Sequence, residues 1–263
     1  MGGGELVNRP LLELKDISLT YNTYLNTELK VLKSISLSVN KGEIIALLGP
    51  SGCGKSTLLN IIAGLEKSFQ GSMILRGISD DNRKGERGFI FQQPVLFSWL
   101  NVEENIEYGL KIKKVPKYKR KQIVKEYIEA VGLKGFEKYY ANELSGGMQQ
   151  RVALARTLVL EPKLILMDEP FAALEPKLRR EMQRLILKLW KEHKYTIVFV
   201  THDIEEAMII AEQVYLMSAS PASIISKIDT SFKNKSNDIN ELEFVNLKNE
   251  IKQFFKLDMV EIS

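Results

Sequence analysis

An α/β fold with a largely parallel sheet is the fold class that the sequence predicts. Three short apolar runs, at residues 44–48, 164–167 and 196–200, lack the alternation of a half-buried strand. Such runs, when turn residues bound them, are typical of strands buried on both faces of a parallel sheet. Alternating segments precede the first run, and a mainly helical stretch at about 95–145 separates it from the second. We therefore expect an N-terminal antiparallel β subdomain, a parallel sheet and an inserted helical subdomain.

Two segments near the N-terminus predict the antiparallel part. Residues 11–21 and 31–39 partly alternate apolar with polar side chains, which is the pattern of half-buried strands. The polar residues 22–30 between them predict a turn or loop.

The inserted stretch predicts a helical subdomain that stands off the sheet. Asn101 is a candidate helix N-cap, and Glu104 three residues later completes a capping box. A second helix is expected to end at Gly132, because glycine commonly follows the last helical turn. Its apolar residues recur at helical spacing on one face: Ile123, Tyr127, Ile128 and Val131.

The C-terminal residues 221–263 are expected to extend a main domain at 11–220. Residues 233–240 are polar and predict a linker. A terminal amphipathic helix is predicted over 242–257 by an apolar stripe, Phe244, Leu247, Ile251, Phe254 and Phe255. This helix has three interpretations, a regulatory element, a contact with a second copy or a buttress of the core, and the buttress is the simplest.

Composition and charge restrict the class of protein. A chain of 263 residues, 44% of them hydrophobic, suits one large α/β domain or two small ones. The net charge of +4 is a mild excess, and the basic run at 111–121 predicts a solvated surface rather than a nucleic-acid site. The single cysteine, Cys53, excludes a disulfide within the chain and is typical of a reducing compartment.

Neither a secretory nor a membrane-crossing segment is predicted. Residues 1–10 lack the apolar centre of a signal peptide. No apolar stretch approaches the ~18 residues that cross a bilayer. We therefore expect a soluble cytoplasmic chain.

Polar and reactive residues follow each of the three apolar runs. They are GPSGCGKST at 49–57, DEP at 168–170 and THD at 201–203. Ligands of open α/β sheets bind outside the carboxyl ends of the strands. The three segments therefore predict one shared site.

Residues 49–56 match the P-loop pattern G-x-x-x-x-G-K-[ST]. The glycines let the backbone wrap a pyrophosphate, and the loop N–H groups face the anion together with the next helix N-terminus. Lys55 is expected to reach the β- and γ-phosphates and the Ser56 hydroxyl to bind Mg²⁺, while Cys53 packs in the loop. The predicted nucleotide-binding residues are Gly49, Pro50, Ser51, Gly52, Cys53, Gly54, Lys55, Ser56 and Thr57.

Two adjacent acids end the second apolar run. Asp168 is expected to hold Mg²⁺ through water, and Glu169 to polarise the water that attacks the phosphate. The alternative for Glu169 is an acid at a helix start, which the upstream P-loop disfavours. After the third run, His202 is predicted to contact the γ-phosphate and Asp203 to cap the next helix.

The segment LSGGMQQRVALARTL, residues 144–158, predicts a second anion-binding helix end. Ser145 is a candidate N-cap, and Gly146 and Gly147 are expected to leave the first-turn N–H groups bare. Because the chain already has one phosphate cradle, the simplest ligand for the second is the γ-phosphate held by another copy of the domain.

With these motifs in this order, the chain resembles an ATPase subunit of an ABC transporter over roughly residues 11–217. The resemblance implies a P-loop NTPase with a RecA-like sheet, and ATP and Mg²⁺ as cofactors. It places Gln92 in the Q-loop, near the metal, and Tyr21 at the A-loop aromatic that stacks on adenine.

The same resemblance assigns the other site residues. It implies that Lys55, Glu169 and His202 are catalytic and that Ser56, Gln92 and Asp168 hold the metal. It implies further nucleotide contacts from the signature residues Ser145, Gly146, Gly147 and Gln149.

The resemblance also implies partners. It predicts a head-to-tail dimer, or a pair of cassettes, with two composite ATP sites, at the cytoplasmic face of a membrane beside permease subunits and, indirectly, a solute-binding protein. Residues 94–106 and 198–208 most resemble nitrate, sulfonate and taurine importers. The alternatives are an exporter ATPase and a soluble ABC ATPase; the second is disfavoured because the chain has one cassette and no long coiled coil.

Glu175 departs from the resemblance, because the D-loop usually has Asp at that position. As the residue before Pro176, it is also expected to act as a helix-start acid.

Overall fold

The structure, a computed structural model, describes residues 9–22, 27–78, 86–231 and 241–260, with only the backbone of 241 and 256–260. The first eight residues and the predicted linker at 233–240 lie outside the described residues. The chain divides into two compact units, one formed by 1–78 with 200–263 and the other by 79–199. Each unit is described by itself.

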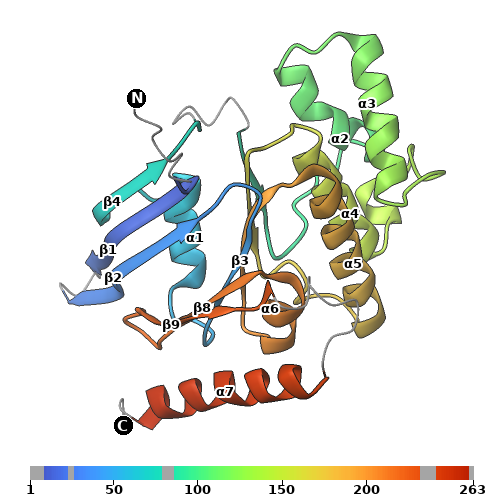
Figure 1. The fold of residues 1–263 in the computed structure, drawn as a ribbon. Coiled ribbons are helices and arrows are strands. Elements are labelled where there is room, and N and C mark those ends of the chain that lie inside the picture. The colour runs from blue at the N-terminus through green and yellow to red at the C-terminus, as the bar shows by residue number, and fades with distance from the viewer. Residues whose placement is uncertain (1–8, 23–26, 79–85, 232–240, 261–263) are drawn as a thin grey trace, which may run out of the picture. The chain divides into compact units, whose positions relative to one another are not determined.

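The antiparallel sheet of the first unit confirms both predicted N-terminal strands. β1 (Leu12–Asn22) lies between β2 (Glu28–Val39) and β4 (Gln70–Leu75) and pairs antiparallel with both (Figure 1). Alternate residues of β1 are buried because one face of the sheet packs on the core. β2 begins earlier than predicted, within the polar segment expected to be a loop.

The first unit also contains the strand that leads to the P-loop. β3 (Ile44–Leu48) is buried along its whole length and pairs parallel with β8 (Gln213–Met217). β9 (Ile224–Asp229) pairs antiparallel with β8. Helices α1 (Lys55–Ala63) and α6 (Ile204–Ile210) belong to the same unit.

In the second unit, the strands run in the order β5, β6, β7. β5 (Arg87–Ile90) pairs parallel with β6 (Leu164–Asp168), and β7 (Thr196–Thr201) reaches the boundary between the units. The predicted runs at 164–167 and 196–200 are thus strands, as expected. α5 (Pro176–His193) follows β6 and buries its apolar face at Met182, Ile186 and Leu189.

The inserted helical subdomain is confirmed, and it consists of α2 (Val102–Ile112), α3 (Lys117–Ala130) and a short 3₁₀ turn, Ala141–Glu143, before α4 (Gly146–Leu158) (Figure 1). The predicted capping box is present, with the Glu104 N–H donating to Asn101 Oδ1 at 2.9 Å and the Asn101 N–H donating to Glu104 Oε2 at 3.0 Å. The three helices share one apolar core.

The predicted face of α3 is confirmed. Ile128 and Val131 are buried in the shared core, and the half-buried Ile123 and Tyr127 pack against it. Val124, absent from the prediction, is buried on the same face, one turn before Ile128. Gly132 adopts a left-handed φ of 70° just beyond the helix, as its position predicted.

The predicted terminal helix is α7 (Glu241–Val260), and it packs on α6 (Figure 1). Ile251 is 0% exposed, whereas the other residues of the predicted stripe are half-buried. Lys248 forms an ion pair with Glu205 of α6. These contacts agree with a helix that buttresses the first unit. Among the described residues, no helix is long and apolar enough to cross a membrane.

Candidate nucleotide-binding site

The P-loop connects β3 to α1 in the first unit. Gly52 and Gly54 have φ values of 76° and 118°, which side chains other than glycine rarely adopt. Gly54 is the N-cap of α1 and supplies no capping oxygen to the first helical turn. The positive end of the α1 dipole therefore lies at the end of a tightly wrapped backbone loop, as an anion site requires.

Close packing fixes two of the loop's glycines in place. A Cβ at Gly49 would lie 2.9 Å from the Met217 carbonyl oxygen, and one at Gly54 would lie 2.9 Å from Leu32 Cδ2. Cys53 is 2% exposed, which agrees with its predicted packing within the loop. The loop is thus held by β2 and β8 as well as by its own chain.

Lys55 folds back over the loop. Its side chain is 4% exposed, and its ammonium donates hydrogen bonds to the carbonyl oxygens of Gly49 at 2.9 Å and Pro50 at 2.7 Å. These two acceptors are neutral, so the positive charge of Lys55 is not cancelled by them. A charge held in this way beside a helix N-terminus fits a phosphate group.

Tyr21 lies near the end of β1, 39% exposed. Its hydroxyl donates to Glu66 Oε2 at 3.0 Å. Burial, with a smaller contribution from the Glu66 hydrogen bond, raises the pKa of Tyr21. The hydrogen bond to Glu66 holds the hydroxyl end of the Tyr21 ring in place. Sequence reasoning missed Glu66 because it lies 45 residues away along the chain.

His202 lies on the turn between β7 and α6. As predicted, Asp203 caps α6, accepting from the N–H groups of Glu205 at 2.8 Å and Glu206 at 3.1 Å. The buried Thr201 hydroxyl donates to Glu206 Oε2 at 2.7 Å and accepts from the Asp203 N–H at 3.0 Å. The turn that carries His202 is therefore fixed from both sides.

Asp168 is the last residue of β6 in the second unit, and Glu169 follows it. Glu169 has a φ of 42°, in the left-handed region that non-glycine residues rarely occupy. Its carbonyl oxygen accepts from the Ala172 N–H at 3.2 Å, which closes a tight turn. Strained backbone of this kind clusters at functional sites. The described residues contain no group of three or more His, Cys, Asp or Glu side chains that could hold a metal.

The glycines of the signature segment differ in their surroundings. Ser145 caps α4 as predicted, its Oγ accepting from the Met148 N–H at 3.3 Å. A Cβ at the exposed Gly146 would meet nothing within 4 Å, but one at Gly147 would lie 2.0 Å from Leu178 Cδ2. Gly147 is buried where α4 meets α5, whereas Gly146 is exposed. That the first-turn N–H groups are free to bind an anion stays a prediction.

Two glutamines of the predicted site, Gln149 and Gln92, also have different surroundings. Gln149 donates to the carbonyl oxygens of Ala141 at 2.8 Å and Leu144 at 3.3 Å, so its amide braces the turn before α4. Gln92 is exposed in the segment after β5.

Glu175 does not cap α5 through its side chain, which corrects the sequence expectation in part. It is the N-cap residue and Pro176 follows in the first turn, but the Glu175 carboxylate makes no capping hydrogen bond. Its longer side chain is poorly placed to reach the first-turn N–H groups, since Asp and Asn are the better capping residues.

The predicted site residues are distributed over both units. The P-loop, Tyr21 and His202 belong to the first, whereas Gln92, the signature segment, Asp168 and Glu169 belong to the second.

A comparison with known protein families decides the identity. Residues 32–172 match the ABC transporter family, and this region spans the P-loop, the signature segment and both acids. This chain belongs to the ABC transporter family. It is the ATP-binding subunit of such a transporter, an ATPase that hydrolyses ATP for transport.

Curated relatives of this ABC subunit include transporter ATPases of known class. The taurine import ATP-binding protein TauB of Pelagibacter ubique is 42% identical over 90% of this chain and 92% of its own length. The aliphatic sulfonates import ATP-binding protein SsuB of Bacillus subtilis is 49% identical over 74% of this chain and 75% of its own length.

Solved structures agree with the fold. The dimeric structure of a post-hydrolysis state of the ATP-binding cassette MJ0796, bound to ADP and Pi, has a TM-score of 0.73 and 33% identity, covering 83% of this chain and 98% of that chain. The ABC cassette fold predicted from the sequence is thereby confirmed.

Proposed function

We propose that this subunit energises the import of taurine or a related aliphatic sulfonate. The observation that carries the proposal is the similarity to TauB, 42% identity over 90% of the chain, together with the 49% identity to SsuB. The alternative of an exporter ATPase has no comparable support among these relatives. The preferred sulfonate would be selected by the permease and by a solute-binding protein.

For ATP binding, we propose that the P-loop backbone and Lys55 hold the phosphates and that the Tyr21 ring stacks on adenine. The support is the anion-binding geometry of the loop and the half-exposed ring held by Glu66. Ser56, Gln92 and Asp168 would hold Mg²⁺, and hydroxyl, amide and carboxylate oxygens are donors that this ion accepts. Mg²⁺ would neutralise charge on the phosphates.

For hydrolysis, we propose that Glu169 orients and polarises the attacking water and that His202 contacts the γ-phosphate. Each lies on a turn fixed by hydrogen bonds of its own unit. Phosphoryl transfer depends mostly on positioning and charge stabilisation, so fixed turns suit this chemistry.

The second helix end is proposed to complete the ATP site of a partner copy. Ser145 and the open space at Gly146 would contact the γ-phosphate held by the other P-loop, with Gly147 and Gln149 supporting that turn. A symmetric head-to-tail dimer forms both sites together. The dimeric state of MJ0796 supports this arrangement.

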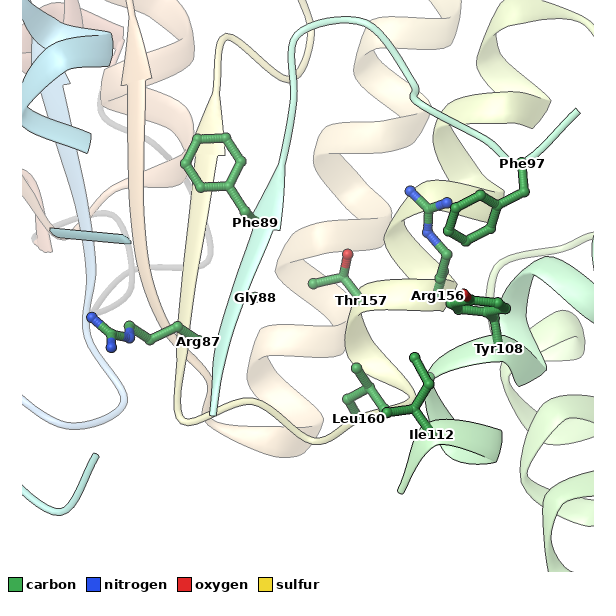
Figure 2. A pocket seen from close by; sticks show the side chains of 10 residues that line it. Arg87, Gly88, Phe89, Phe97, Tyr108, Ile112, Arg156, Thr157 and Leu160 are labelled. Atoms are coloured by element: carbon green, nitrogen blue, oxygen red, sulfur yellow. The ribbon is translucent and has the colours of Figure 1, made fainter. Parts of the chain in front are cut away.

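A pocket on the second unit is proposed as the docking site for a short permease helix. It has a volume of about 270 Å³ and lies among β5, α2 and α4 (Figure 2). The Arg156 guanidinium lies 5.1 Å from the centre of the Phe97 ring and donates to the Val95 carbonyl oxygen at 2.6 Å. Burial lowers the pKa of Arg156.

The rim of this pocket is apolar in a way that suits a helix. Tyr108 and Ile112, which line the pocket, are exposed large side chains. Trp99 is 71% exposed, and its ring lies 5.5 Å from that of the lining residue Phe97. The Tyr108 ring packs at a tilt against that of Phe97, with ring centres 4.5 Å apart. Exposed apolar side chains around a concave site mark protein interfaces. We propose that the subunit binds its permease through this pocket, at the cytoplasmic face of the membrane.

The import proposal is tested on the purified subunit reconstituted with its permease in vesicles. Binding protein loaded with taurine or an alkanesulfonate should stimulate ATP hydrolysis and deliver the solute into the compartment that contains the ATPase. Binding protein loaded with sulfate serves as the control. Stimulation by an unrelated solute alone, or movement of solute outward, would contradict the proposal.

A further inference from the structure

A buried glutamine links the signature helix to the turn that carries Glu169. Gln150 lies on the second turn of α4 and is 2% exposed. Its Nε2 donates to the carbonyl oxygen of Pro170 at 3.2 Å, and Pro170 directly follows Glu169. Both partners are buried, and both belong to the second unit.

The amide of Gln150 is expensive to bury. Within the described residues, its Oε1 is buried without a hydrogen-bond partner. A buried acceptor that has lost water and gained no donor destabilises the folded state. If this position served packing alone, an unbranched apolar side chain of similar volume, such as methionine, would suit it better. The hydrogen bond to Pro170 is the contact that the amide provides and an apolar side chain does not.

The turn that receives this hydrogen bond needs external support. Glu169 is held at a φ of 42°, and a strained residue keeps such a conformation only when its surroundings fix it. Pro170 has no N–H, so its carbonyl oxygen is the only backbone hydrogen-bonding group of that residue. On the far side, the buried Phe171 ring anchors the turn. Gln150 thus fixes the turn between the catalytic acid and its anchor.

We propose that Gln150 is a positioning residue for hydrolysis, holding the Pro170 carbonyl and thereby the direction of the Glu169 carboxylate. The inference rests on the proposed role of Glu169 as the residue that polarises water. α4 begins at the signature segment, so the same rigid helix carries the residues facing a partner's ATP and the residue that orients Glu169. A shift of the signature helix is transmitted to the catalytic turn through one hydrogen bond.

The test compares Gln150→Met with wild type in the full-length subunit. Methionine keeps the volume but removes the donor and the unpartnered acceptor. We expect kcat for ATP hydrolysis to fall on the order of 10- to 100-fold, as a misplaced catalytic group does. KM for ATP should stay within about twofold, because the phosphate-binding residues are untouched. The urea midpoint should equal or exceed that of wild type.

Two further variants complete the experiment. Gln183→Met makes the same chemical change at a second buried glutamine, on α5, and should keep the wild-type kcat. Gln150→Leu repeats the test with another shape, in case methionine alone impairs folding. In both Gln150 variants, kcat should fall without a fall in the urea midpoint.

The outcomes separate this inference from the proposed function. If Glu169→Gln hydrolyses ATP at the wild-type rate, the role of Glu169 is wrong. If Glu169→Gln is inactive and Gln150→Met keeps the wild-type kcat, only the positioning role fails. A kcat that falls together with the urea midpoint in both Gln150 variants would show that Gln150 is a packing residue, and would also overturn the inference.

Discussion

Replacing Gly147 with alanine should destabilise the protein through a clash between two helices. The new Cβ would lie 2.0 Å from Leu178 Cδ2, about 1.5 Å closer than the ~3.5 Å of an ordinary carbon contact. The Leu178 Cγ atom, at 2.7 Å, is also too close, so turning the end of the side chain does not remove the overlap. Overpacking of this kind costs about 1–3 kcal/mol.

The assay is urea unfolding of Gly147→Ala, Leu178→Ala and the double variant, without nucleotide. Leu178 is half-buried, so its loss alone should cost on the order of 1–2 kcal/mol. Because the shorter side chain makes room for the new methyl group, the double variant should be less destabilised than the sum, by about 1–3 kcal/mol. Additive effects would refute the clash.

Gly146→Ala is the matched control. Its Cβ would meet nothing within 4 Å, and neither glycine has a positive φ that alanine would strain. The free energy of unfolding should therefore stay within about 0.5 kcal/mol of wild type. Equal stability of the two single variants would show that Gly147 is not required for the packing of α4 on α5.

Three other predictions concern contacts elsewhere in the structure. Ile251→Ala should lower the free energy of unfolding by about 2–5 kcal/mol, because this fully buried residue of α7 leaves a cavity; chemical denaturation measures it. Lys55→Ala should abolish ATP binding in equilibrium titrations, since it removes the buried ammonium over the P-loop, and unchanged affinity would contradict the P-loop assignment. Burial opposes the ionisation of Glu107, but hydrogen bonds from Arg120 and Lys111 outweigh it and hold its pKa below 4.5. Glu107→Gln should therefore cost about 0.5–1 kcal/mol at pH 7. That difference should shrink as pH falls from 4.5 through the depressed pKa, and a constant difference would contradict the ion pairs.

The strands that carry the site were predictable because burial leaves a direct mark on the sequence. β3, β6 and β7 are short apolar runs, and the runs exist because both faces of each strand are covered. β4 gave no such signal, since it is an edge strand with mostly exposed side chains and forms only by pairing with the distant β1. β8, in contrast, is a buried apolar strand whose run the sequence reasoning missed, and β9 follows it closely in sequence and pairs with it.

The site residues also divide into those that a local pattern predicts and those that only tertiary packing brings into place. The P-loop is recognisable because phosphate binding constrains neighbouring residues in one stretch of chain. The residues that orient the site, such as Glu66 beside Tyr21 and Gln150 beside Pro170, are brought there by tertiary packing. At Glu175 the sequence suggested a contact that is not formed: the residue occupies the N-cap position of α5, but its side chain makes no capping hydrogen bond. Nothing in the structure explains why that residue is Glu rather than Asp.

The measurement that tests the central claim most directly is sedimentation of Glu169→Gln with Mg²⁺ and ATP, together with its rate of hydrolysis. If Glu169 polarises water in a composite site between two copies, the variant should bind ATP, stall hydrolysis and sediment as a dimer. Wild-type turnover, or a monomer at saturating ATP, would contradict the account.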